Sequence, residues 1–135
     1  PEEMARADAA AVTAGVPGIV LMEAAGRAVA RAAIRRYRPT RTLVLAGPGK
    51  SGGDARIAAR LLADRGHGVK VAELAAIGRV APRPVLLDGL FCTGLSRPLD
   101  CSDELRRLAA AAELVVALDL PSGLETDTGR SIGAV

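Results

Sequence analysis

The 135-residue sequence has almost no aromatic side chains: one tyrosine, one phenylalanine and no tryptophan. Proteins that hold single-stranded nucleic acid stack its bases on aromatic side chains, so the composition argues against that class. The net charge of +3 is too modest to indicate a polyanion as partner. Half of the residues are hydrophobic, and the length suffices for one domain with a core of its own.

Cysteine and histidine are scarce as well. The two cysteines, Cys92 and Cys101, are not spaced as C-x-x-C, and His67 is the single histidine. These residues cannot supply the usual ligand set of a zinc site. The sequence also has no signal peptide and no apolar run of membrane-spanning length. We therefore expect a protein of the reducing cytoplasm.

Short apolar runs alternate with helical patterns along the chain. Strands are predicted at 42–46, 69–73, 85–88 and 114–118, and helices at 1–14, 19–36, 55–65 and 102–112. The strand runs are apolar without alternation, as in strands buried on both faces. Interleaved with helices, they predict an α/β fold with a parallel, doubly wound sheet. Gly26, inside the second helix, indicates close approach to a neighbouring element.

One connection is unusually short. Only about eleven residues separate the strand ending at Glu73 from the strand starting at Val85, whereas a parallel crossover normally needs a dozen or more, usually with a helix. We expect that a segment is missing near residues 75–84.

The most informative stretch is Ala46-Gly-Pro-Gly-Lys-Ser-Gly-Gly-Asp54, between a strand and a helix. Glycine-rich turns in that context hold phosphates on backbone N–H groups. Gly49-Lys50-Ser51 matches the end of a Walker A loop, which would indicate a nucleotide hydrolase. That motif also needs a glycine where Val44 stands, so the match is incomplete. A dinucleotide-binding loop and a plain tight turn both remain open. Asp54 is compatible with an N-cap role or with a catalytic one.

Three loops follow the carboxyl ends of predicted strands, at 47–54, 89–98 and 119–123. Ligands of open α/β sheets bind at that edge. Asp88 and Asp119 each close a strand. Either could be a turn or cap residue, but two aspartates at equivalent strand ends favour a shared pocket.

Taken together, these residues resemble the YjeF N-terminal domain family, the NAD(P)HX epimerases. The similarity follows the order of the chain and extends over nearly all of it. The matching segments are Met4 and Asp8 with Leu21-Met-Glu23 and Ala25-Gly26; Gly47-Pro-Gly49, Gly52-Gly-Asp54 and Ala58-Ala-Arg60; Asp88-Gly-Leu-Phe91, Thr93-Gly-Leu95 and Arg97-Pro98; and Ala117-Leu-Asp119, Pro121-Ser-Gly123 and Asp127-Thr-Gly129.

The resemblance implies a three-layer αβα, Rossmann-like, mostly parallel sheet with two extra N-terminal helices, as a single domain over residues 1–135. It implies an isomerase of metabolite repair that interconverts the R and S epimers of hydrated NADH and NADPH, and we expect a homodimer. In many bacterial relatives an ADP- or ATP-dependent dehydratase domain follows, and we expect chain to be missing after residue 135.

The resemblance also implies the site. The substrate-binding residues would be Lys50, Ser51, Gly52, Gly53, Asp54, Cys92, Thr93, Gly94, Leu95, Ser96, Arg97, Pro98 and Asp119. Ser51, Asp88 and Ser122 would hold K⁺, for which oxygen ligands are suited. Epimerisation breaks and remakes a bond at the hydrated carbon, so a proton-shuttling carboxyl group is needed. The candidates are Asp119, as first choice, and Asp54.

Two departures from the family pattern bear on activity. The family has asparagines where Lys50-Ser51 stands, and glycine where Cys92 stands. The Lys50 ammonium could replace the potassium ion or point outward to a ligand phosphate. The alternative to an epimerase is therefore a binding or interaction module of the same fold that has lost catalysis.

Overall fold

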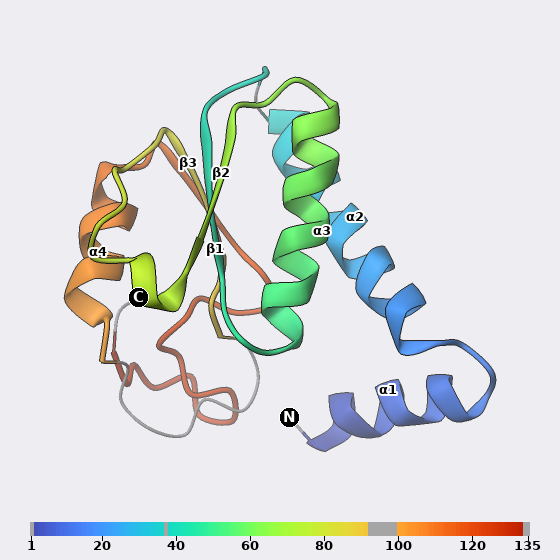
Figure 1. Cartoon of the computed structure of the whole chain (residues 1–135). Coiled ribbons are helices and arrows are strands. Elements are labelled where there is room, and N and C mark those ends of the chain that lie inside the picture. Colours follow the sequence, from blue (N-terminus) through green and yellow to red (C-terminus); the bar gives the residue numbers. More distant parts are fainter. Residues whose placement is uncertain (1, 37, 92–99, 134–135) are drawn as a thin grey trace.

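A computed structural model describes residues 2–36, 38–91 and 100–133, and shows one parallel sheet of four strands with helices on both faces (Figure 1). The strand order is β2-β1-β3-β4. The elements are α1 (Glu2–Thr13), α2 (Gly18–Arg36), β1 (Thr42–Ala46), α3 (Lys50–Asp64), β2 (Val69–Glu73), a 3-10 turn η1 (Leu74–Ala76), β3 (Val85–Gly89), α4 (Ser102–Ala111) and β4 (Leu114–Ala117).

The sheet separates two apolar cores. Strands β1 and β3 are buried at every position because each has a strand on both sides. One core packs Ala58 and Leu62 of α3, with Ala30 of α2, on the sheet face that carries Val44 and Leu87. The other core packs Leu105 and Leu108 of α4 on the face that carries Leu43, Leu45 and Leu86. This arrangement confirms the predicted α/β fold with helices on both sides of a parallel sheet.

The N-terminal helices differ in how they pack. Helix α2 lies along α3, and Gly26 allows this close approach, since a Cβ atom there would lie 2.6 Å from Ile57 Cγ2. The predicted close approach of a neighbouring element at Gly26 is thus confirmed. Helix α1 has no buried residue and lies near the end of the sheet at which β1 and β3 terminate (Figure 1). No helix in the described part of the chain is long and apolar enough to span a membrane.

Several predicted boundaries were wrong. Helix α3 begins at Lys50, five residues before the predicted start at Ala55, so most of the expected loop 47–54 is helical. Helix α4 begins at Ser102 as predicted but ends at Ala111, one residue before the predicted end. Strands β2 and β4 form the two edges of the sheet, with Val71 40% and Val115 44% exposed, and neither is buried on both faces as predicted.

The short connection between β2 and β3 contains a single 3-10 turn, η1. It passes over β1 on the α4 side of the sheet, where Leu74, Ile77 and Val80 join the core. Arg107 of α4 donates hydrogen bonds of 3.3 Å to the carbonyl oxygens of Ile77 and Val80. The crossover therefore closes without an α-helix of its own.

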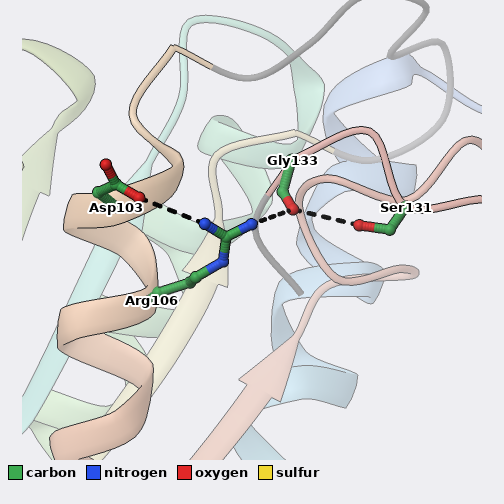
Figure 2. Close-up of polar contacts among 4 residues, drawn as sticks. All are labelled: Asp103, Arg106, Ser131 and Gly133. Carbon is green, nitrogen blue, oxygen red and sulfur yellow. Dashed lines mark hydrogen bonds and ion pairs between the residues drawn. The ribbon is translucent and has the colours of Figure 1, made fainter.

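The segment after β4 folds back as an irregular loop that is tied to α4. Figure 2 shows Arg106 between the Asp103 carboxylate, at 3.3 Å, and the Gly133 carbonyl oxygen, at 2.9 Å. Ser131 Oγ donates to the same carbonyl at 3.1 Å, and Leu124 pairs with Ser131 in an isolated antiparallel bridge. These contacts help to fix the loop that carries Ser122.

Candidate functional site

The site lies at the carboxyl ends of β1 and β3, where the order in which the chain adds strands to the sheet reverses. From β1 the chain moves outward to β2, and then returns to build β3 and β4 on the other side. Crevices at such switch points are where ligands of open α/β sheets bind. The Gly47 N–H donates to the Gly89 carbonyl oxygen at 3.0 Å, which joins the two strand ends directly.

The glycine-rich turn is shaped by contacts within the protein. A Cβ atom at Gly47 would lie 1.9 Å from the Leu90 carbonyl oxygen, and one at Gly52 would lie 1.7 Å from the Gly47 carbonyl oxygen. At Gly53 the nearest atom would be Met22 Sδ, 2.5 Å away. Gly49 has nothing within 4 Å of its Cβ position. Three of these glycines therefore permit close packing, and Gly49 faces open space.

Gly49 is also the N-cap of α3, and no side chain caps this helix end. The first N–H groups of a helix have no partner within the helix and attract negative groups. Asp54 lies in the second turn, so its interpretation as the N-cap is wrong. The turn thus offers an open helix N-terminus next to the switch point.

Asp88 and Ser122 form the most buried polar contact of the site. Asp88 is the penultimate residue of β3, and Ser122 lies in the loop after β4. Ser122 donates to Asp88 twice, from Oγ at 2.6 Å and from its backbone N–H at 2.7 Å, and the Leu90 N–H donates at 3.3 Å. Phe91 N–H donates to Ser122 Oγ at 3.0 Å. Burial raises the pKa of Asp88, and the hydrogen bonds from Ser122 and Leu90 oppose that rise.

The oxygen atoms of Asp88 and Ser122 are suited to a hard monovalent cation. Asp88 is only 3% exposed and has no ion pair within the described ranges. Its three hydrogen bonds leave one of roughly four acceptor positions of a carboxylate open. No cluster of three or more His, Cys, Asp or Glu side chains suited to a metal occurs among the described residues. Any cation site here would thus depend on one carboxylate and neutral oxygens.

Asp54 has a strongly perturbed acidity. Partial burial raises the pKa of Asp54 to about 6, with the negative charges of Asp119 and Asp8 adding to the rise and Lys50 opposing it. A carboxyl group with such a pKa can hold or release a proton near neutral pH. Perturbed groups of this kind concentrate at functional sites.

The remaining predicted residues are placed as follows. Ser51 is buried in the first turn of α3, and its carbonyl oxygen would lie 3.1 Å from a Cβ atom at Gly89. Asp119 is exposed, two residues past β4, in the left-handed conformation with φ 61°. Lys50 is 80% exposed and pairs with Asp8 at 3.8 Å, rather than with Asp88. Seven predicted substrate-binding residues lie outside the described residues: Cys92, Thr93, Gly94, Leu95, Ser96, Arg97 and Pro98.

Asp8 is the residue of this region that was given no role from the sequence. It lies on an exposed helix far along the chain from the glycine-rich turn, and no local pattern connects the two. Only the resemblance in the N-terminal helices drew attention to it. The contact with Lys50 depends on how α1 is placed relative to α3, which local sequence does not encode.

Comparison with known proteins identifies relatives of this chain. The family described as the YjeF-related protein N-terminus matches residues 18–81 and 73–135. The bifunctional NAD(P)H-hydrate repair enzyme Nnr of Hyperthermus butylicus is 36% identical over 168 residues, which cover 98% of this chain and 31% of that protein. The NAD(P)H-hydrate epimerase of Limosilactobacillus fermentum is 33% identical over 147 residues, which cover 88% of this chain and 71% of that protein.

The chain therefore spans about a third of its bifunctional relatives. The NAD(P)H-hydrate epimerase of Bordetella pertussis is 37% identical over 143 residues, which cover 86% of this chain and 63% of that protein. Among solved structures, the yeast protein ynu0 superposes with a TM-score of 0.69 at 22% identity, covering 84% of this chain and 67% of that one, and so shares the fold. With its family matched from residue 18 to residue 135, the chain belongs to the family of YjeF-related protein N-termini.

Proposed function

We propose that the protein is an NAD(P)HX epimerase, which interconverts the R and S forms of hydrated NADH and NADPH. Family membership and relatives that are themselves NAD(P)H-hydrate epimerases support this substrate class. The observation that carries the proposal is Asp54, a carboxyl group with a pKa of about 6 at the switch point of the sheet, under the influence of Asp119.

The proposed reaction needs a proton donor beside the oxygen or nitrogen atom that is bonded to the hydrated carbon. A bond from this carbon to oxygen or nitrogen breaks as a carboxylic acid protonates the departing atom, and the same bond re-forms on the other face as the carboxylate takes the proton back. Asp119, the first choice, and Asp54 are the two carboxyl groups proposed for this exchange, and Asp54 can exist in both forms near neutral pH. Proton transfer by a positioned group contributes about 10²–10⁴-fold to rate.

Substrate binding is proposed to use the helix end and the loops around it. The open N-terminus of α3 at Gly49 would accept the phosphates of the dinucleotide, because unpaired N–H groups and the helix dipole favour negative charge. Asp88 and Ser122, with Ser51, are the residues proposed to hold K⁺, and the ion would supply positive charge for the substrate phosphates. Ser122 fixes the Asp88 carboxylate through its two hydrogen bonds.

The test of the catalytic assignment is Asp119→Asn. Asparagine tolerates the left-handed backbone of this position, φ 61°, so the variant should fold and lose about 10²–10⁴-fold in epimer exchange. Asp103→Asn, which removes an exposed carboxylate from α4, is the control and should retain the parent rate. Full activity of Asp119→Asn would exclude the proposed role.

The assembly around this domain is also a proposal. Because this chain covers only about a third of the bifunctional relatives, we propose that a dehydratase acts with this domain, fused or as a separate partner. The alignment with the Hyperthermus butylicus protein runs over 168 positions against 135 residues in this chain, and the family matches residues 18–81 and 73–135 as two segments. Both observations support a longer β2–β3 crossover in relatives. The predicted homodimer can be tested by light scattering.

A further inference from the structure

Helix α1 reaches the candidate site through one ion pair. It lies near the N-terminal end of α3 (Figure 1), and Asp8 Oδ2 lies 3.8 Å from Lys50 Nζ. The Asp8 side chain is 42% exposed, against 80% for Lys50. No residue of α1 is buried, so apolar packing does little to hold this helix in place. The contact with Lys50 is therefore a specific link between α1 and the first turn of α3.

The same link extends to Asp54. Lys50 and Asp54 are four residues apart in α3, so their side chains lie on one face of the helix, one turn from each other. Asp8 meets this face from α1, and Asp119 acts on Asp54 from the loop after β4. One ammonium and two carboxylates, from three separate elements, thus converge on the Asp54 carboxyl group.

We propose that Asp8, together with Lys50, is a positioning residue of the candidate site: the pair holds α1 across the first turn of α3, and the two side chains set opposing charges around Asp54. Asp8 favours the protonated form of Asp54, and Lys50 favours the ionised form. The proposed use of this balance in proton transfer rests on the proposed epimerase function, whereas the charge arrangement itself does not.

The other charged groups nearby are paired among themselves. Helix α2, which packs on α3, carries Glu23, and this carboxylate lies 3.8 Å from Arg60 of α3 and 4.0 Å from Arg27 of α2. The three groups together carry one positive charge, and none of them is among the charges that shift the pKa of Asp54. The charges that act on Asp54 are therefore those of Asp119, Asp8 and Lys50, in that order.

The experiment is a carbon-13 NMR titration of the Asp54 side-chain carboxyl between pH 4 and pH 8. In the parent protein the midpoint is expected at about 6. Asp8→Asn should lower the midpoint and Lys50→Gln should raise it, each by about half a pH unit, the size expected for one charge removed nearby in a partly exposed site. Asp8→Glu keeps the charge and should restore a midpoint near the parent value.

Two results would overturn the proposal. An unchanged midpoint in Asp8→Asn would show that Asp8 does not act on Asp54. A midpoint lowered by both Asp8→Asn and Lys50→Gln would show that the pair only tethers α1, because loss of the tether would hydrate Asp54 in either variant. The surface variant Asp103→Asn, which breaks an ion pair on α4, is the control and should not move the midpoint.

The pH profile of epimer exchange supplies a second readout. The pH at which the rate is half-maximal should move in the same direction as the NMR midpoint in each variant. If the midpoints move in opposite directions as expected but the protein exchanges no epimers, the epimerase proposal fails and the charge arrangement stands. If exchange occurs and its pH profile is the same in both variants as in the parent, the positioning role of Asp8 and Lys50 in the reaction is refuted.

Discussion

Gly52→Ala is the substitution for which the structure makes the sharpest prediction about the glycine-rich turn. Two effects oppose each other at this position. Alanine is favoured over glycine inside a helix by about 1 kcal/mol, so on helix propensity alone the variant would be more stable. However, the new Cβ atom would lie 1.7 Å from the Gly47 carbonyl oxygen, where ordinary contacts begin at 3.4 Å.

The steric effect should exceed the gain in propensity. Gly47 cannot retreat, since its own Cβ position is 1.9 Å from the Leu90 carbonyl oxygen. Overpacking of a tight site costs about 1–3 kcal/mol, and occasionally more, and here the atoms that must move belong to the backbone. Because backbone atoms must move, we take the upper end of that range, about 3 kcal/mol. After the gain in propensity is subtracted, we expect Gly52→Ala to lower the free energy of unfolding by about 2 kcal/mol.

The neighbouring glycine is the matched control. Gly53→Ala brings the same gain in helix propensity, but its Cβ atom would meet Met22 Sδ, the end of a flexible side chain that can adopt another rotamer. We expect Gly53→Ala to change the free energy of unfolding by no more than about 0.5 kcal/mol. Urea unfolding of both variants measures the difference. Equal stabilities would refute the account in which the α3 helix packs directly on the Gly47 carbonyl.

Three further predictions concern burial and charge. Ser122→Ala should cost about 1–3 kcal/mol of unfolding free energy, because buried Asp88 loses a hydrogen-bond donor; urea unfolding that shows no loss would contradict this. The pKa of Asp54 in the folded protein, about 6, exceeds the ordinary 3.8, so this group makes the fold less stable as pH rises from about 4 to 6. The stability of Asp54→Asn relative to the parent should therefore rise across that window. A difference in unfolding free energy that does not change with pH would argue against the raised pKa. Gly26→Ala should lower the melting temperature by several degrees, as its Cβ would lie 2.6 Å from Ile57 Cγ2, and an unchanged melting temperature would argue against the close helix contact.

The sheet could be predicted from the sequence because its strands are short apolar runs. Strands β1 and β2 have the predicted bounds, Thr42–Ala46 and Val69–Glu73. Strand β4 shows the limit of that reasoning. Its apolar run, Leu-Val-Val-Ala, predicts a strand buried on both faces, yet β4 forms one edge of the sheet and Val115 is 44% exposed. Apolar composition does not reveal how many neighbours a strand will have.

The start of α3 was missed for a different reason. Two glycines and a serine follow Lys50, and glycine is a poor helix former, so the local sequence favours a loop. Packing of these small residues on the Gly47 carbonyl and on Met22 stabilises the helix instead. Tertiary contacts thus override propensity in the turn that the candidate site depends on.

The candidate site was predictable only in part. The rule that ligands bind at the carboxyl ends of parallel strands predicted a pocket shared by the loops after β3 and β4. The family resemblance paired Asp88 with Ser122, and the structure joins these two residues by hydrogen bonds. The perturbed acidity of Asp54 was not predictable, because it depends on burial and on charges from three elements. Asp8 lies 42 positions from Lys50 in the chain, so only the folded arrangement reveals their ion pair.

The central claim is tested most directly by epimer exchange. The protein is mixed with the R form of NADHX, with and without potassium, and the S form is followed by chromatography against the spontaneous rate. The account predicts clear acceleration that is greater with potassium and is lost in Asp119→Asn. A folded protein that leaves the spontaneous rate unchanged would contradict the epimerase assignment and would favour a binding module of the same fold.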